Sequence, residues 1–238
     1  MRRVFLGAGL ILGALGALSP ATSSAATIVG QAAPASAIQM SCAALTGVQD
    51  ASGAGAPSYT IPTDGVLTSF RTRASAATGK SMRLIVFRGV GPTFTVVGRG
   101  DSQPLTPSTL NQFPARMPVQ AGDLLGVDTT GGWCVFAGVA GDHHWFDFFD
   151  PAPGGPFNPG NDASGNRWNV EATLEPDADH DGYGDETQDQ CPTDASTQGP
   201  CPAAPATGQR AAALKKCKKK HSARARRKCR QKANLLPL

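Results

Sequence analysis

The sequence predicts an all-β fold, an antiparallel β-sandwich or jelly roll, followed by an acidic loop segment and a basic helical C-terminal tail. Short apolar runs recur at regular spacing along residues 27–175, with no helix-length connector between them. With 28 Gly and 19 Pro among 238 residues, the chain is too rich in helix breakers for a helical bundle. With 40% hydrophobic and 17% charged residues, it is too apolar for wholesale disorder.

Residues 1–26 predict a signal peptide. Arg2 and Arg3 form a positive n-region, residues 4–18 are apolar apart from Gly, and the small residues at 24–26 suit a signal peptidase, so the mature chain is expected to begin near Thr27. The arginine pair also resembles a twin-arginine signal, which leaves the Sec and twin-arginine routes open. No other stretch reaches the ~18 apolar residues of a membrane-spanning helix. We therefore expect a secreted, extracellular or cell-surface protein without a transmembrane segment, with a retained N-terminal anchor as the alternative.

Residues 27–175, here called the head, form the predicted β-sandwich domain. The head is nearly neutral, with eight basic and nine acidic residues between positions 27 and 170. In the run 82–88, the even positions 82, 84 and 86 are apolar and predict a buried face, whereas the other face mixes Arg83 with Ile85 and Phe87. Runs rich in Val, Thr, Ile and aromatics predict strands at 58–61, 66–73, 82–88, 94–98, 124–127, 133–137 and 169–174.

Residues 119–127 resemble the turn-then-strand signature of extracellular jelly-roll domains, in which Gly122 and Asp123 turn the chain before a buried strand. Such domains often bind carbohydrate or protein, but a fold by itself assigns no function. The chain has six cysteines, and Cys42 and Cys134 are the two in the head. Because an exported chain with an even number of cysteines favours disulfides, we expect these two to pair.

The best catalytic candidates lie at Asp142, His143, His144 and Asp147, beside Trp145. An imidazole can act as a base when a carboxylate orients it. Adjacent residues on a strand point to opposite faces, however, and the chain has no G-x-S-x-G or H-E-x-x-H motif. We therefore expect no enzyme, with a secreted glycan- or ester-acting hydrolase as the alternative.

Aromatic residues concentrate in the last third of the head. They predict core packing, with a sugar-stacking platform as the alternative. The set is Trp133, Trp145, Phe146, Phe148, Phe149, Phe157 and Trp168.

Residues 176–202, here called the acidic segment, carry a pattern typical of a calcium loop. Carboxylates stand at loop positions one, three, five and nine and Gly at position six, which is the spacing by which an EF-hand-type loop wraps a cation. Hard carboxylate oxygens select Ca2+ over zinc or copper. The alternative is a solvated acidic linker. The loop reads Asp177-Ala178-Asp179-His180-Asp181-Gly182-Tyr183-Gly184-Asp185.

With its D-x-D-x-D-G-x-G-D core and closing Cys191-Pro192, this segment resembles a thrombospondin type 3 repeat, an extracellular calcium-binding element. The resemblance covers about residues 177–192. At position twelve, where the family usually has an acidic residue, this chain has Gln188, and Asp189 follows it. The resemblance implies side-chain ligation by four aspartates, a backbone ligand, and Gln188 or Asp189 as the final ligand. The implied set is Asp177, Asp179, Asp181, Tyr183, Asp185, Gln188 and Asp189.

The remaining cysteines follow the calcium pattern. Cys191 and Cys201 flank a short polar stretch, and we expect them to pair. Residues 203–209 read as a linker, and residues 210–238, here called the basic tail, carry twelve Lys and Arg with no Asp or Glu. On one continuous helix Cys217 and Cys229 would lie ~18 Å apart, whereas a disulfide needs less than about 7 Å. The tail is therefore expected to turn back as a stapled hairpin or to bond another chain.

Together these patterns predict a secreted or cell-surface calcium-binding protein that acts as an adhesion, binding or structural module. The basic tail is expected to retain it on cell-wall or other anionic polysaccharide. An extracellular nucleic-acid-binding protein is a further alternative, but the tail has no aromatic residue for stacking bases, so no specific nucleic acid is expected. A tail that is only solvated, or that folds back onto the acidic segment, also stays open.

Overall fold

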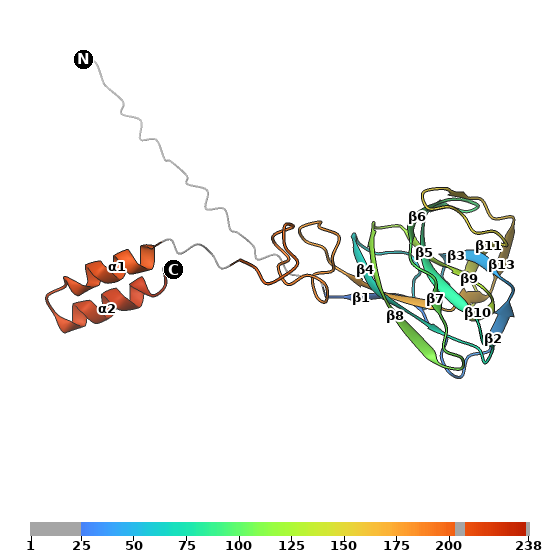
Figure 1. The fold of residues 1–238 in the computed structure, drawn as a ribbon, viewed down its shortest axis with the longest axis horizontal. Coiled ribbons are helices and arrows are strands. Elements are labelled where there is room, and N and C mark those ends of the chain that lie inside the picture. The colour runs from blue at the N-terminus through green and yellow to red at the C-terminus, as the bar shows by residue number, and fades with distance from the viewer. Residues whose placement is uncertain (1–24, 203–207, 237–238) are drawn as a thin grey trace, which may run out of the picture.

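The computed structural model describes residues 25–202 and 208–236 (Figure 1). The predicted signal peptide, up to residue 24, and most of the predicted linker lie outside the described residues. Within them the chain forms fifteen β-strands followed by two α-helices. All strands belong to the head, and the last ends at Glu175.

Three sheets make up the head, and every strand pair in them is antiparallel. Sheet A has the order β1 (Thr27–Gln31), β15 (Val170–Glu175), β4 (Gly65–Arg73), β8 (Leu110–Val119). Sheet B has the order β14 (Asn166–Trp168), β10 (Gly132–Ala137), β2 (Gln39–Cys42). Sheet C has the order β12 (Pro156–Phe157), β6 (Thr93–Arg99), β5 (Ser81–Val90), β9 (Leu124–Thr129), β3 (Leu45–Ala51), β11 (His143–Asp147), β13 (Asn161–Ser164), with β7 (Gln103–Pro104) beside β5. The predicted antiparallel, all-β architecture is confirmed.

One hydrophobic core joins the three sheets. Leu67 and Val170 of sheet A, Leu84 and Leu125 of sheet C, and Trp168 of sheet B belong to a single buried cluster. A fully buried side chain of this size contributes about 1.5–3 kcal/mol. The core therefore explains why the alternating runs of the sequence form sheets that pack on one another.

Sheet C is buried on its other face as well. Ile85 and Phe87 of β5 pack with Phe94 and Phe157 in a second buried cluster. The face of β5 that mixes Arg83 with these residues is thus largely covered. Phe157 and Trp168 are core residues, as the core-packing interpretation predicted, whereas Phe148 is 62% exposed.

The observed strands differ from the predicted runs, because one run is not a strand and several strands, among them β1, β3, β8 and β11, lie outside the runs. The run 58–61 forms one bridge, from Thr60 to Leu124, and buries Tyr59, whose hydroxyl donates to the Trp168 carbonyl (2.5 Å). Strand β8 contains Pro114 and Pro118. It lies at the edge of sheet A, where a missing N–H breaks no ladder on the outer side.

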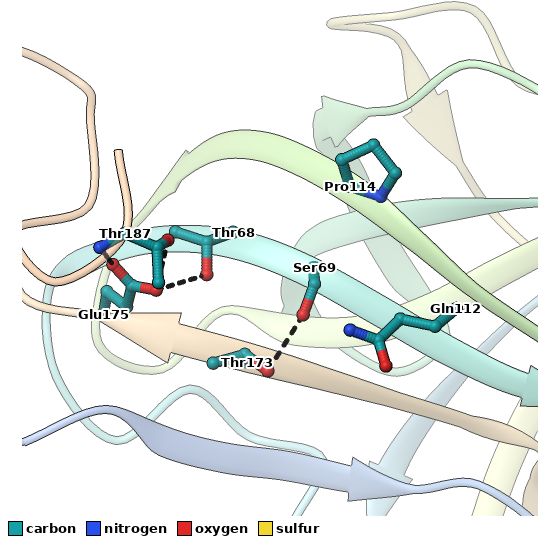
Figure 2. Close-up of a pocket in the computed structure, with 7 residues that line it drawn as sticks. All are labelled: Thr68, Ser69, Gln112, Pro114, Thr173, Glu175 and Thr187. Carbon is teal, nitrogen blue, oxygen red and sulfur yellow. Dashed lines mark hydrogen bonds between the residues drawn. The ribbon is translucent and has the colours of Figure 1, made fainter. Parts of the chain in front are cut away.

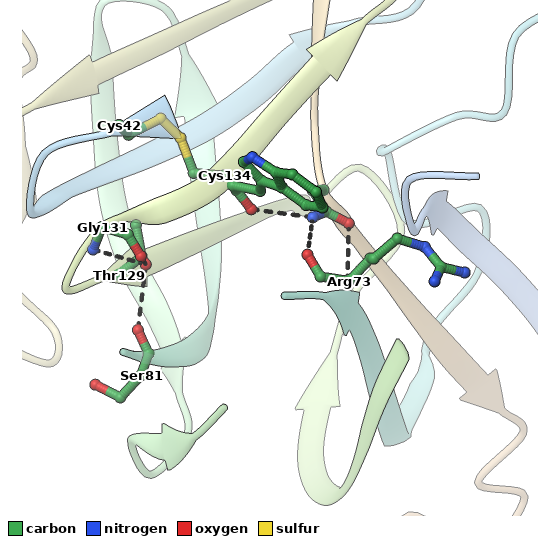
Figure 3. Close-up of a disulfide and its surroundings, with 8 residues drawn as sticks. Cys42, Arg73, Ser81, Thr129, Gly131 and Cys134 are labelled. Atoms are coloured by element: carbon green, nitrogen blue, oxygen red, sulfur yellow. Dashed lines mark hydrogen bonds between the residues drawn. A yellow bond between two sulfur atoms is a disulfide. The ribbon is translucent and has the colours of Figure 1, made fainter. Parts of the chain in front are cut away.

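The three predicted cysteine pairs are all present as disulfides. Cys42 on β2 and Cys134 on β10 have Cα atoms 5.9 Å apart (Figure 3). In the acidic segment, the Cα atoms of Cys191 and Cys201 lie 4.7 Å apart.

The tail is a hairpin, which decides between the two alternatives for its cysteines. Helix α1 (Gln209–Lys218) and helix α2 (Ala223–Ala233) are joined by the disulfide between Cys217 and Cys229, whose Cα atoms lie 5.4 Å apart. Ser222 caps α2 by accepting a hydrogen bond from the Ala225 N–H (3.2 Å). Neither helix described by the structure is long and apolar enough to cross a bilayer.

Candidate metal centre

Glu175, the last residue of β15, connects the head to the acidic segment. Its carboxylate accepts hydrogen bonds from the hydroxyls of Thr68 (2.8 Å) and Thr187 (2.7 Å) (Figure 2). It also accepts from the N–H groups of Glu186 (3.0 Å) and Thr187 (2.9 Å). Burial alone would raise the pKa of Glu175, but these hydrogen bonds to the charged form outweigh it and lower the pKa. The ionised carboxylate thus holds residues 186 and 187 against β4.

A second contact fixes the segment to β8. The Gln188 amide donates to the Ala115 carbonyl (2.7 Å), and its oxygen accepts from the Gly184 N–H (3.3 Å). The Arg116 guanidinium lies 4.4 Å from the centre of the Tyr183 ring, a cation–π contact. Tyr183 and Gln188 therefore both anchor the acidic segment to β8.

The aspartates at loop positions one, three and five converge. One carboxylate oxygen from each of Asp177, Asp179 and Asp181 lies within 4.8 Å of those of the other two. The loop wraps around Asp177, which accepts hydrogen bonds from the Asp181 N–H (3.1 Å) and the Gly182 N–H (3.0 Å). Gly182 has a φ of 84°, in the left-handed region that favours glycine. The sharp turn predicted at position six is thus present.

Asp179 is the most unusual residue of the cluster. Both of its carboxylate oxygens are buried, and neither has a hydrogen-bond partner among the described residues. Leaving a buried polar group unpaired costs about 1–3 kcal/mol, and more for a charged group. A cation bound beside Asp179 would supply the missing partner.

Two further aspartates lie close to the cluster. Burial raises the pKa of Asp185, and the charges of Asp177, Asp179 and Asp189 raise it further, against the hydrogen bond that it accepts from the Ala178 N–H. Asp189 is only 3% exposed. Its Oδ1 accepts from the Cys191 N–H (2.8 Å), whereas its Oδ2 is buried and has no partner within the described part of the chain.

These contacts bear on the two candidates for the final ligand. Both ends of the Gln188 amide are engaged, the nitrogen with the Ala115 carbonyl of the head and the oxygen with the Gly184 N–H of the segment. Asp189 instead carries a free buried oxygen and is coupled to Asp185. The geometry therefore favours Asp189 over Gln188.

The donor set fits a hard cation. All of the side-chain atoms that converge are carboxylate oxygens, which Ca2+ prefers, whereas zinc and copper prefer nitrogen and sulfur ligands. The charges of Asp177, Asp179 and Asp189 already raise the pKa of Asp185. A divalent cation would relieve this repulsion and satisfy the unpaired oxygens together.

The candidate catalytic residues of the head do not converge on one site. Asp142 is fully buried and pairs with Arg167 (2.7 Å). His143 lies between the carboxylates of Asp50 (2.6 Å) and Asp162 (3.2 Å), which raise its pKa against the effect of burial.

The neighbouring histidine and the last candidate aspartate lie elsewhere. His144 packs on Trp168 (ring centres 5.0 Å apart) and is 3% exposed, so the two adjacent imidazoles occupy different surroundings, as expected for a strand. Asp147 accepts hydrogen bonds from the N–H groups of Phe148 (2.7 Å) and Gly160 (3.0 Å) and contacts neither histidine through a hydrogen bond among the described residues.

The sequence did not single out Glu175, Thr68 or Ala115, which position the acidic segment. Glu175 lies 12 positions from its partner Thr187, Ala115 lies 73 from Gln188 and Thr68 lies 107 from Glu175, so a linear pattern contains no signal for these contacts. Comparison of the chain with known protein families, with curated proteins and with solved structures finds no match. The interpretation of the site therefore depends on its residues and their geometry.

Proposed function

We propose that this is an exported calcium-binding module, in which the acidic segment resembles a thrombospondin type 3 repeat and binds Ca2+ against a β-structured head. The observation that carries the proposal is Asp179, whose two buried oxygens have no partner among the described residues and lie beside the carboxylates of Asp177 and Asp181. A cation would supply the counter-charge that these carboxylates lack among the described residues.

The proposed ligands are the convergent carboxylates and one backbone oxygen. Asp189 replaces the acidic residue expected at position twelve, because Gln188 is engaged with Ala115. The Tyr183 carbonyl is the backbone ligand at position seven. The full set is Asp177, Asp179, Asp181, Tyr183, Asp185 and Asp189.

For the head we propose a jelly roll with an adhesive or structural role. If β1, β3, β4, β5, β6, β8, β9 and β15 are numbered one to eight, the sheet orders read 1-8-3-6 and 2-7-4-5. This order is typical of two interlocked Greek keys. This strand order supports the assignment of the head as a jelly roll, a topology that antiparallel sheets do not require by themselves.

The basic tail is the proposed attachment device. Its hairpin carries twelve Lys and Arg over residues 210–232 and no acidic residue, so any polyanion attracts it. A protein with three disulfides suits an oxidising, extracellular setting. Cell-wall or other anionic polysaccharides are the partners that this setting offers.

A calorimetric titration of the mature chain with CaCl2 tests the proposal. We expect saturable uptake of calcium by the wild-type chain and by Asp194→Asn, whose carboxylate lies in the same segment and accepts hydrogen bonds from Ser196. The Asp179→Asn variant should lose this uptake. Equal heats in the two variants would show that the cluster around Asp179 is not the binding site.

A further inference from the structure

An apolar cavity opens on the head, away from the acidic segment. It has a volume of about 420 Å³, within the range of small-molecule sites, and lies where sheet B meets strands β3, β11 and β13. Apolar side chains from these strands dominate its lining, which includes Met40, Leu45, Val135, Phe146 and Trp168. None of its lining residues carries a formal charge at neutral pH, since its only titratable member is His144.

Two residues of this lining bury polar atoms that have no partner. The indole Nε1 of Trp168 and the imidazole Nδ1 of His144 are both shielded from solvent, and neither has a hydrogen bond within the described residues. Trp168 is 1% exposed and His144 is 3% exposed, and their ring centres lie 5.0 Å apart. Unpaired buried groups are rare in native proteins, and two in contact call for a shared explanation.

The two atoms have complementary roles. Indole Nε1 always carries a hydrogen and can only donate. The ring of His144 hydrogen-bonds to the Asn166 backbone, and burial lowers the His144 pKa to about 4, so the ring is neutral near pH 7. A neutral ring that donates from one nitrogen presents the other, Nδ1, as an acceptor. Two lining residues whose ring centres lie 5.0 Å apart therefore hold one unpaired donor and one unpaired acceptor.

An exposed aromatic ring borders the same cavity. Phe148 is 62% exposed and contacts Phe146 edge to face, with ring centres 5.9 Å apart at 90°. Large aromatic side chains are seldom left this open without a partner. A flat apolar ring can stack on Phe148 while it covers the apolar lining.

We propose that this cavity binds a small, uncharged, mainly apolar ring compound that carries a hydroxyl group. A hydroxyl both accepts and donates, so it can accept from Trp168 Nε1 and donate to His144 Nδ1. Solvent reaches neither atom in the present arrangement, so the ligand displaces the aromatic wall as it enters. The inference is independent of calcium, since the residues that line the cavity all belong to the head.

The test uses 2-naphthol, which is uncharged at neutral pH, and the mature, disulfide-bonded chain labelled with nitrogen-15. Three indole N–H signals are expected, and those of Trp133 and Trp145 are assigned with Trp→Phe variants. We expect 2-naphthol to bind saturably and to shift the Trp168 indole signal. The methyl ether 2-methoxynaphthalene, which cannot donate, should bind about tenfold more weakly. The charged 2-naphthalenesulfonate should not bind.

A matched pair of variants locates the site. Ala163 lines the cavity, and its neighbour on β13, Ser164, is exposed on the other side of the strand. Ala163→Phe should abolish the binding of 2-naphthol, and Ser164→Phe should leave it unchanged. Absence of binding to the wild-type chain, binding that survives Ala163→Phe, or equal affinity for 2-naphthol and its methyl ether would each overturn the proposal.

Discussion

The head and the acidic segment both bury carboxylates, but these carboxylates differ in their hydrogen-bond partners. In the head, Asp142 accepts hydrogen bonds from the N–H groups of Gly53 (2.8 Å) and Val139 (2.5 Å) and from Arg167 (2.7 Å). In the segment, neither oxygen of Asp179 has a partner among the described residues. The buried carboxylate of Asp142 is therefore satisfied by groups of the head, whereas that of Asp179 has no such partner among the described residues.

The largest loss of stability is expected on substitution of Asp142, whose carboxylate accepts hydrogen bonds from three groups of the head. Burial opposes ionisation, but the hydrogen bonds from Gly53, Val139 and Arg167 lower the Asp142 pKa. Asp142→Ala should lower the free energy of unfolding by about 3–5 kcal/mol, because it leaves the buried Arg167 charge unpaired. Urea unfolding of the mature chain measures this loss, with Asp162→Ala, a 55% exposed side chain, as control. A loss of less than 1 kcal/mol in Asp142→Ala would contradict this account of the head.

A smaller loss of stability is expected on substitution of Glu175, a carboxylate of the head whose hydrogen-bond partners include residues of the acidic segment. Glu175→Gln should destabilise the docked segment by about 2 kcal/mol, because it weakens charge-assisted hydrogen bonds from Thr68 and Thr187. Hydrogen exchange at the Thr187 amide should become faster while exchange in sheet C stays unchanged. Equal protection of the Thr187 amide in the wild-type chain and in Glu175→Gln would mean that Glu175 does not anchor the segment.

The pH dependence should have opposite signs in the two regions. The Glu175 pKa is lowered from 4.5, so its stabilisation is present above that value and is lost as the pH falls through the folded-state pKa. The Asp185 pKa is raised from 3.8, so the calcium-free segment gains stability as the pH falls through the raised value.

The raised Asp185 pKa also bears on calcium itself. Because the ligands must be ionised, calcium affinity should be constant at high pH and fall once the pH approaches the raised Asp185 value. Titrations at a series of pH values measure this, with Asp185→Asn as the matched variant. A variant that binds calcium with the same pH profile as the wild type would show that Asp185 is not a ligand.

The sequence predicted local features well. Alternation in residues 82–88 marked β5, and the spacing of Asp177, Asp179 and Asp181 marked the loop in which they converge. Both patterns depend on positions a few residues apart, where backbone periodicity decides which side chains share a face. Short-range geometry excluded one continuous helix between Cys217 and Cys229, and the structure shows the hairpin in which they pair.

Long-range features were not predictable in the same way. The strand β8 was hidden by Pro114 and Pro118, because only its place at the edge of sheet A makes proline acceptable. The pairing of Asp142 with Arg167 and the docking of Gln188 on Ala115 join residues that only the folded sheets bring together. A single sequence contains no signal for such contacts.

Native mass spectrometry of the mature chain in millimolar CaCl2 measures the cation that the segment is inferred to hold. We expect a mass increase of one calcium ion for the wild-type chain. We expect no such increase for Asp179→Ala, whose head should remain folded by circular dichroism. A wild-type chain whose mass is unaffected by calcium, or an Asp179→Ala chain that takes up the ion equally well, would contradict the central claim.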